Sequence, residues 1–272
     1  MNGFVTTLRG KFSFAQVAFL EHAFALLWLA PFCLRWRSHI LPRAQLKLHA
    51  LRVLSAVCGV LFFYQALGKL PMATVVALGF LGPIFTTLGA VFFLNEVLTW
   101  SRVAAVGLGI LGALFIKKTF FSPFWNVNDV WLLFPVLSSL AFSISNLTNK
   151  KLTFKVSPLV LAHVLIFWMT PFFGLLALPT FVMPQVSELF LFSVLGFLTV
   201  LAHYSLSASL KLTDITFLLP IGSLRFIFTA LIGFVFFAQV PGFSVYLGFF
   251  VIFMALCVLG FFEKKHKRSS VP

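Results

Sequence analysis

The chain has 272 residues, of which 61% are hydrophobic and only 10% are charged, and its mean hydropathy is +1.07. A soluble domain carries about a quarter charged residues, so this composition excludes that class and indicates a chain that crosses a membrane several times. The formal net charge of +14 does not predict a nucleic-acid partner, because most of the cations lie in short runs between apolar segments. We expect a lipid bilayer as the surroundings and no nucleic acid.

Nine apolar runs are long enough to cross a bilayer, whose core of about 30 Å requires about 20 helical residues. The short run Val103 to Ile116 becomes a full span when Trp100 and Ser101 are added. The predicted fold class is therefore all-α, with nine transmembrane helices. The runs are Phe12 to Leu34, Leu51 to Gly68, Met72 to Leu94, Val103 to Ile116, Val130 to Leu147, Ser157 to Phe181, Leu189 to Leu210, Ile215 to Phe237 and Phe243 to Phe262.

Lysine and arginine are retained in cytoplasmic loops, so their positions predict the orientation of the helices. Every second connection, counted from the first run, is rich in them, and the tail "EKKHKR" follows the last run. This places the C-terminus in the cytoplasm and, with nine helices, the N-terminus outside. The pattern fits a bacterial inner membrane. The cations assigned to the inner side are Arg35, Arg37, Arg43, Lys47, Arg52, Arg102, Lys150, Lys151, Lys155, Lys211 and those of the tail.

The chain contains an internal repeat, because Leu70 to Lys118 is similar to Leu212 to Lys265. The two copies are an odd number of helices apart, so equivalent helices cross the membrane in opposite directions, as in transporters with inverted repeats. We predict a first repeat at 1–118, an outer linker at 119–129, and a second repeat at 130–272 that ends in the basic tail.

The first repeat lacks one helix. "TTLR" (Thr6 to Arg9) matches "TNKK" (Thr148 to Lys151), which ends the first helix of the second repeat. Residues 1–8 therefore correspond to the stub of a helix, and the chain has four plus five helices on a plan of five plus five. Either the reading frame begins further upstream or the helix has been lost.

The same residues carry a family resemblance. "ALGKLPMATVVALGFLGPIFTTLGAVFFLNEVLTWSRVAAVGLGILGALFI" resembles the core of the EamA family in the drug/metabolite transporter superfamily. The shared features are a mid-helix proline, an acidic residue at the helix end and a glycine-rich next helix. "FLNE", "NKKL" and "AQVPG" are similar to the branch that contains S-adenosylmethionine uptake carriers. The matching positions are Pro83, Glu96, Gly107, Gly109 and Gly112, and in the second half Pro220, Gly233, Pro241 and Gly248.

The resemblance implies a fold of ten helices, with substrate held between the repeats and exchanged by alternating access. The chain departs from the family pattern in its missing first helix. It also has Gln239 where the second repeat usually has Glu, and Glu21 where Arg is common.

Two charged residues lie in the middle of predicted spans, where an ionised side chain costs roughly 2.5 to 3.5 kcal/mol and should face a cavity or a partner. They are Glu21 and Arg225. We predict that they pair across one central cavity and mark the substrate site. Arg225 suits a carboxylate or phosphate and Glu21 a cationic group, so an amino acid or S-adenosylmethionine would satisfy both. The alternatives are an ion pair that only fixes packing, a snorkelling Arg225, or a protonated Glu21.

Four aromatic or imidazole side chains are further candidates for the substrate site. His203 could instead join helices by a hydrogen bond or carry a proton, and Trp168 could be a packing residue. The candidates are Tyr64, Trp168, His203 and Tyr204.

Two prolines lie in helices that the repeat relates, Pro83 and Pro220. Each removes a backbone hydrogen bond and permits a kink, so both are candidate hinges, with static kinks as the alternative. Ala105, Gly109 and Ala113 form a small-residue face that could serve bundle packing or a homodimer. The serines of "SSLAFSISN" are of the type that joins membrane helices.

No catalytic motif occurs in the sequence, which lacks HExxH, GxSxG, a P-loop and a Cys/His cluster. We therefore expect no enzyme, no catalytic residue, no metal and no cofactor. Without an ATP site, transport would be secondary. The sequence predicts a carrier of a small polar or zwitterionic metabolite, and the alternative is a truncated paralogue that does not transport. A channel fits less well, because one opposed pair is not a ring of like charges.

Overall fold

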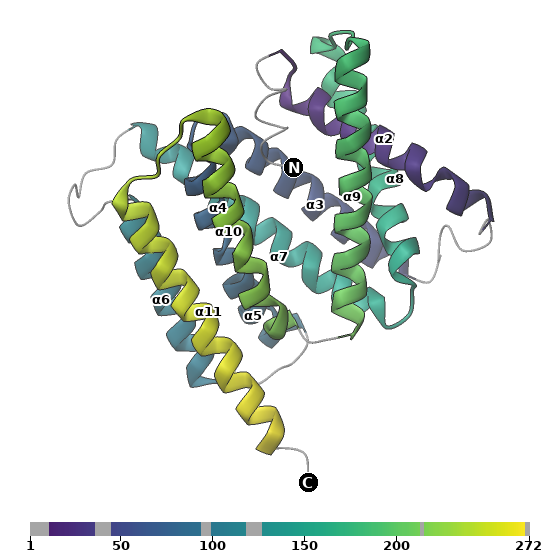
Figure 1. Cartoon of the computed structure of the whole chain (residues 1–272). Helices are drawn as coiled ribbons and strands as arrows, with labels where there is room; N and C mark the ends of the chain where they lie inside the picture. Colours follow the sequence, from purple (N-terminus) through teal and green to yellow (C-terminus); the bar gives the residue numbers. More distant parts are fainter. Residues whose placement is uncertain (1–10, 36–44, 94–98, 118–126, 213–214, 270–272) are drawn as a thin grey trace. The chain divides into compact units, whose positions relative to one another are not determined.

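The computed structural model describes residues 11–35, 45–93, 99–117, 127–212 and 215–269 (Figure 1). These residues form α-helices and short 3₁₀ helices and contain no strand. Their contacts divide the chain into two compact units. Unit 1 combines residues 1–61 with 148–212, and unit 2 combines 62–147 with 213–272. Unit 1 thus takes one stretch from each predicted repeat, whereas residues 62–147 of unit 2 run from the first repeat through the linker into the second. The repeats themselves and their opposite orientation stay predictions.

The helices are named as in Figure 1. Unit 1 contains α2 (Phe14–Arg35), most of α3 (Leu46–Leu67), α8 (Pro158–Ala177), the 3₁₀ helix η4 (Leu178–Thr180) and α9 (Val186–Leu212). Unit 2 contains α4 (Met72–Gly79), α5 (Leu81–Phe93), α6 (Trp100–Lys117), the 3₁₀ helix η3 (Val127–Leu132), most of α7 (Leu133–Thr153), α10 (Ile215–Phe237) and α11 (Phe243–Ser269).

Eight stretches of the described residues are helical, long and apolar enough to cross a bilayer. They coincide with eight of the nine predicted runs, and α6 begins at Trp100, as the extension of the short run required. The remaining run is α10, whose described apolar part, Arg225–Phe237, is shorter than a full span. The all-helical membrane fold is confirmed, and the count of nine spans stays a prediction. The stub at residues 1–8 and Glu96 lie outside the described residues.

Several cations that the sequence assigned to connections lie inside helices. Lys47 and Arg52 belong to α3, and Arg102 belongs to α6. Arg52 and Arg102 are also buried. The helix α3 begins at Leu46, five residues before its apolar run begins at Leu51. The helix can begin earlier because the apolar stems of Lys and Arg side chains pack along its surface.

Contacts between helix ends agree with the predicted order of crossing. In unit 1, Lys11 before α2 forms an ion pair of 2.7 Å with Glu188 in the first turn of α9. In unit 2, the backbone N–H of Met72 at the start of α4 donates to Oε1 of Gln239, between α10 and α11, at 3.1 Å. Each contact joins segments that the sequence places together on the outer side. The orientation of the chain in the membrane stays a prediction.

The third predicted span is interrupted at Phe80, since α4 ends at Gly79 and α5 begins at Leu81. Pro83 explains the break, because it has no N–H to donate to the Gly79 carbonyl and its ring crowds that carbonyl. At the break itself, the Phe80 N–H donates to the carbonyl of Ala77, three residues earlier, at 3.2 Å. By contrast, α10 is one continuous helix through residue 220. A hinge role for either proline stays a prediction.

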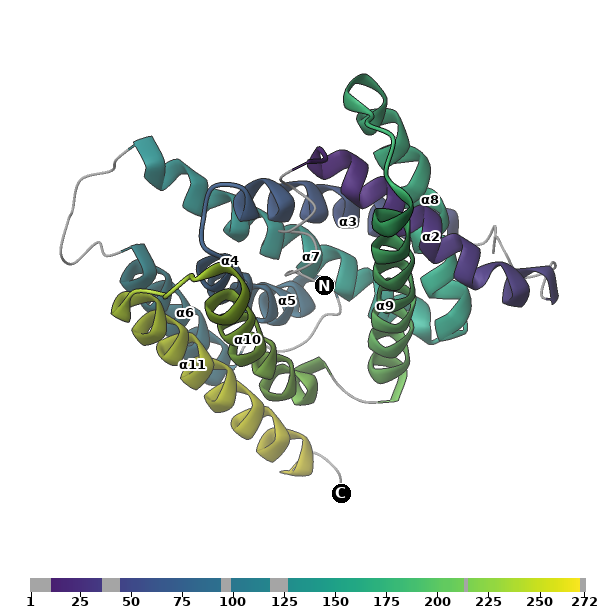
Figure 2. The ribbon, with the colours of Figure 1, turned by 45° about the horizontal axis from the view of Figure 1, so that its top comes forward.

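In unit 2, α6 and α11 lie side by side, as Figures 1 and 2 both show. Gly112 of α6 packs against Gly248 and Ile252 of α11. Gly109 of α6 packs against Ile84 of α5, and Ala105 is buried. The small-residue face of α6 is therefore used within the chain, and a homodimer stays a prediction.

A polar contact joins α5 to α7 in the same unit. The Ser143 hydroxyl donates to the Gly82 carbonyl at 2.5 Å and accepts from Thr86 Oγ1 at 3.0 Å. Ser143 thus joins two membrane helices, as its place in the serine-rich stretch predicted.

Candidate functional site

Glu21 lies in the interior of unit 1, on α2, with 2% of its surface exposed. The Thr199 hydroxyl on α9 donates to Glu21 Oε1 at 2.5 Å. This hydrogen bond offsets part of the cost of burying a polar side chain in an apolar layer. The mid-span acid therefore faces a polar partner within the protein.

His22, the next residue, faces a different helix. Its Nδ1 lies 2.8 Å from the Ala18 carbonyl oxygen one turn earlier, so Nδ1 carries a proton and donates it. The ring lies 5.5 Å from that of Phe173 on α8, between centroids. Consecutive residues project about 100° apart around a helix, which is why Glu21 reaches α9 while His22 reaches α8. Nε2 of His22 is buried and has no hydrogen-bond partner among the described residues.

His203 follows Thr199 by one helical turn on α9, so the two side chains point the same way. It is half-buried. Arg52, on α3, donates from Nη1 to the Leu161 carbonyl of α8 at 2.8 Å. The hydrogen bonds of Glu21 and Arg52 join α2 to α9 and α3 to α8, respectively.

Sequence reasoning missed both Arg52 and Thr199 as site residues. Arg52 was counted with a basic loop, although it is the seventh residue of α3. Thr199 lies in an apolar run, and only the folded structure shows that α9 packs on α2. His22 and His203, by contrast, can be recognised in the sequence as polar residues within predicted spans.

The other two candidates in unit 1 are exposed in this structure. Trp168 on α8 and Tyr204 on α9 have exposed fractions of 40% and 43%. Trp168 makes an edge contact with Phe167, at 5.7 Å between centroids.

The remaining candidates, Tyr64 and Arg225, lie in unit 2. Tyr64 is buried, with 7% of its surface exposed. The Arg225 guanidinium carbon lies 5.3 Å from the centroid of the Phe80 ring, a cation–π contact at the break between α4 and α5. Glu21 and Arg225 belong to different units, so their pairing stays a prediction.

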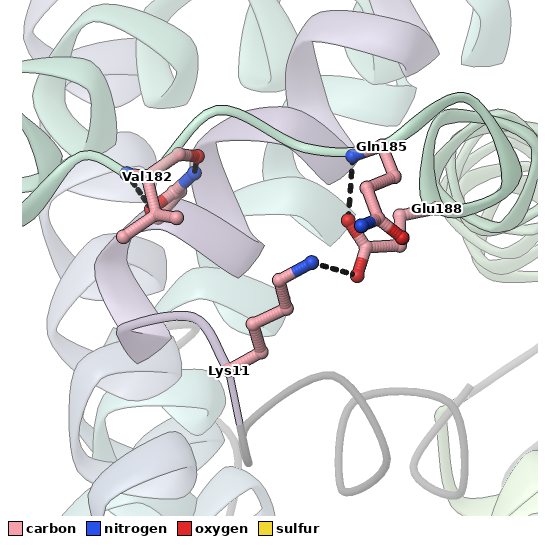
Figure 3. A network of polar contacts seen from close by, with 5 residues as sticks. Lys11, Val182, Gln185 and Glu188 are labelled. Atoms are coloured by element: carbon pink, nitrogen blue, oxygen red, sulfur yellow. Dashed lines mark hydrogen bonds and ion pairs between the residues drawn. The ribbon is translucent and has the colours of Figure 1, made fainter.

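A second polar network ties the start of α2 to the segment before α9 (Figure 3). Glu188 accepts from Lys11 Nζ at 2.7 Å through Oε1 and from the Gln185 N–H at 2.6 Å through Oε2. Gln16 is fully buried and binds the Val182 backbone twice. Its Oε1 accepts from the Val182 N–H at 2.9 Å, and its Nε2 donates to the Val182 carbonyl.

The interior of unit 1 contains several polar side chains. Its interior offers a carboxylate, two imidazoles, a guanidinium and a hydroxyl, which together can bind a polar solute or hold a proton. Among the residues that the structure describes, no group of three or more His, Cys, Asp or Glu side chains could hold a metal ion.

Residues 4–117 match the model of the EamA-like transporter family. A protein named riboflavin transporter, from Rhizobium johnstonii, is 32% identical over 270 residues, which are 97% of this chain and 86% of that protein. The chain belongs to the EamA-like transporter family. Membership confirms the resemblance found in the sequence and makes the chain a membrane transporter of the small-metabolite class.

Other relatives of this EamA-like transporter carry two names. The riboflavin transporter of Vibrio cholerae is 28% identical over 93% of this chain and 84% of its own length. The S-adenosylmethionine uptake transporter of Rickettsia prowazekii is 26% identical over 93% of this chain and 85% of its own length. Among solved structures, the crystal structure of a protein that is 18% identical aligns with a TM-score of 0.65, covering 94% of this chain and 90% of that chain. This last likeness concerns the fold alone.

Proposed function

We propose that this EamA-like transporter is a secondary carrier that moves a small heteroaromatic metabolite across a bacterial inner membrane by alternating access. The observation that carries the proposal is the similarity to a riboflavin transporter over 97% of the chain. Riboflavin and S-adenosylmethionine each join a flat heteroaromatic ring system to a hydroxylated five-carbon unit. A carrier for either needs polar groups within the membrane and aromatic faces for the ring, and this chain has both.

The proposed substrate site joins polar and aromatic side chains from both halves of the sequence. Glu21 is its acceptor, already oriented by Thr199. Arg225 is its donor, and its fork can bind a carboxylate, a carbonyl pair or a phosphate. Pro83 and Pro220 are the proposed hinges. The aromatic and imidazole members of the site are Tyr64, Trp168, His203 and Tyr204.

The two substrates differ in charge, which provides a discriminating test. Riboflavin is uncharged near neutral pH, whereas S-adenosylmethionine carries a sulfonium, an ammonium and a carboxylate. The relative named riboflavin transporter is 32% identical and the relative named S-adenosylmethionine uptake transporter is 26% identical, which favours riboflavin as the substrate. A pair of Glu21 and Arg225 would instead suit the charged S-adenosylmethionine. Competition between the two solutes for the same carrier separates these cases.

Proteoliposomes that contain the purified chain would test the proposal by counterflow exchange of labelled riboflavin, S-adenosylmethionine and a panel of amino acids. We expect exchange of at least one of them, and we expect Glu21→Gln and Arg225→Ala each to abolish it without changing insertion or the size-exclusion profile. Lys155→Ala, at an exposed position, is the matched control and should keep full exchange. Absence of exchange for every solute would contradict the proposal and favour the paralogue that does not transport.

A further inference from the structure

We infer that Nε2 of His22 is a substrate-binding atom, which accepts a hydrogen bond from an uncharged N–H or O–H group of the solute. The inference rests on the proposed function, because it assigns one more residue to the same site. It adds a chemical requirement, since the solute must carry a hydrogen-bond donor at the place where it meets His22.

The way in which His22 can form further hydrogen bonds is fixed by its own helix. Nδ1 lies 2.8 Å from the Ala18 carbonyl oxygen, which can only accept, so Nδ1 carries the proton of the neutral ring. The lone pair of the neutral ring is therefore on Nε2. In this tautomer His22 offers an acceptor, and not a donor, to any further partner.

Nε2 is an acceptor that the described part of the protein leaves without a partner. His22 has 2% of its surface exposed, so bulk water does not reach the ring in this conformation. None of the described residues donates to Nε2. Buried polar atoms nearly always have a hydrogen-bond partner, because an unsatisfied one costs free energy. A partner that arrives and leaves with the solute explains why the described residues provide none.

The neighbours of His22 leave this role to an incoming molecule. On α8, the ring beside His22 is that of Phe173, at 5.5 Å between centroids, and this phenyl ring has no donor. On α2, the preceding residue Glu21 accepts from Thr199 and faces α9 instead. Trp168, a proposed member of the substrate site, also belongs to α8. The proposed site therefore extends from the α9 side of α2 to its α8 side.

The acceptor is uncharged, which decides the class of donor that suits it. An imide N–H, a ring amino group or a hydroxyl can donate to a neutral imidazole without the cost of a further charge within the membrane. Riboflavin carries an imide N–H and hydroxyls, and S-adenosylmethionine carries a ring amino group and ribose hydroxyls. His22 therefore suits the uncharged ring or hydroxylated unit that both solutes contain.

Two substitutions separate binding of the solute from a structural role. In His22→Asn the amide nitrogen takes the place of Nδ1, so the bond to the Ala18 carbonyl can form while no atom takes the place of Nε2. In His22→Gln the amide reaches the place of Nε2, and its oxygen can accept. If His22 only stabilised α2, asparagine would be the milder change. If Nε2 binds the solute, glutamine is the milder change.

The test measures counterflow of labelled riboflavin in proteoliposomes and its inhibition by two unlabelled analogues. One is 3-methylriboflavin, which lacks the imide donor, and the other is lumiflavin, which lacks the hydroxylated chain. We expect the wild type to bind one of them about tenfold more weakly than riboflavin, as the loss of one hydrogen bond predicts. His22→Asn should bind riboflavin about tenfold more weakly and lose that preference, whereas His22→Gln should keep it. His163→Asn, elsewhere on α8, should behave as the wild type does.

The outcomes distinguish this inference from the proposed function. Wild-type affinity and wild-type preference in His22→Asn would overturn the inference and leave the proposed function standing. Equal binding of riboflavin and both analogues by the wild type would do the same. A wild type that exchanges neither riboflavin nor S-adenosylmethionine would overturn both.

A second measurement needs no substitution that could impair folding. The nitrogen resonance of a lone-pair imidazole nitrogen shifts when that atom accepts a hydrogen bond, and it can be recorded for the whole protein in lipid nanodiscs. We expect the Nε2 resonance of His22 to move when the solute that the wild type exchanges is added. A resonance that the solute leaves unchanged would show that water or another group is the partner, and would overturn the inference.

Discussion

Gly112 of α6 and Gly248 of α11 bring two helix backbones into direct contact. A Cβ atom on Gly112 would lie 2.7 Å from the Gly248 carbonyl oxygen, and one on Gly248 would lie 2.5 Å from the Gly112 carbonyl oxygen. Membrane helices associate largely through packing of this kind, because lipid offers no hydrophobic drive between them. The pair of glycines therefore fixes how closely α6 and α11 approach.

Alanine at either glycine should destabilise the protein. Gly112→Ala and Gly248→Ala each force the two backbones apart, at a cost of about 1 to 3 kcal/mol. Thermal unfolding in detergent measures the loss. Gly107→Ala is the control, because no atom of the described residues outside its own helix turn lies within 4 Å of its Cβ position, and it should be neutral or slightly stabilising. Equal melting temperatures for all three variants would contradict the packing described.

The hydroxyl of Thr199 should contribute measurably to stability. Thr199→Val keeps the shape of the side chain but removes the donor to Glu21, and leaving a buried carboxylate short of a donor costs about 1 to 3 kcal/mol. Thr199→Ser keeps the donor and should retain most of the stability. The comparison uses the same unfolding assay, and a valine variant as stable as the serine variant would show that the hydrogen bond has no role.

Two residues of the network in Figure 3 should differ in how much they contribute to the stability of the protein. Lys11→Met removes an exposed ion pair, so we expect a small change that disappears at high salt. Gln16→Met removes two hydrogen bonds to the Val182 backbone, which should cost about 1 to 3 kcal/mol at any salt concentration. Unfolding measured at low and high ionic strength distinguishes the two variants. A larger loss of stability for Lys11→Met than for Gln16→Met would contradict the structure.

Ala238 has a φ of +49°, in the left-handed region that disfavours residues with a Cβ atom. Ala238→Gly should therefore stabilise the protein by about 1 kcal/mol. The same substitution inside α10, Ala230→Gly, should destabilise it by about 0.5 to 1 kcal/mol, because glycine loses more freedom in a helix. Opposite shifts in melting temperature are the expected result, and shifts of the same sign would count against the turn conformation.

The sequence predicted the helices well, because lipid requires long apolar runs in which the backbone satisfies its own hydrogen bonds. It failed at the start of α3, where Lys47 lies in the helix before the apolar run and Arg52, the second residue of that run, was counted with the preceding connection. It predicted a kink from Pro83, but the interruption lies at Phe80, since a proline disturbs the turn before it.

The sequence also predicted that Glu21 faces protein, because a charged side chain exposed to lipid is costly. This cost applies whichever residue is the partner. The sequence did not show Thr199 as that partner, because hydropathy does not reveal which helices pack together. The same limit applies to His22. Its ring contact with Phe173 depends on α2 and α8 being neighbours, which no spacing within one helix can predict.

The break at Phe80 has a consequence for how a solute could act on the backbone. Arg225 stacks on Phe80, and its Nη2 lies 3.7 Å from the Cβ position of Gly79, whose carbonyl cannot receive a hydrogen bond from Pro83. The cation thus lies beside a peptide group that lacks the hydrogen bond of a regular helix. We predict that an anion bound by Arg225 would draw the guanidinium away from Phe80, so that solute binding would change how the third span bends at this break.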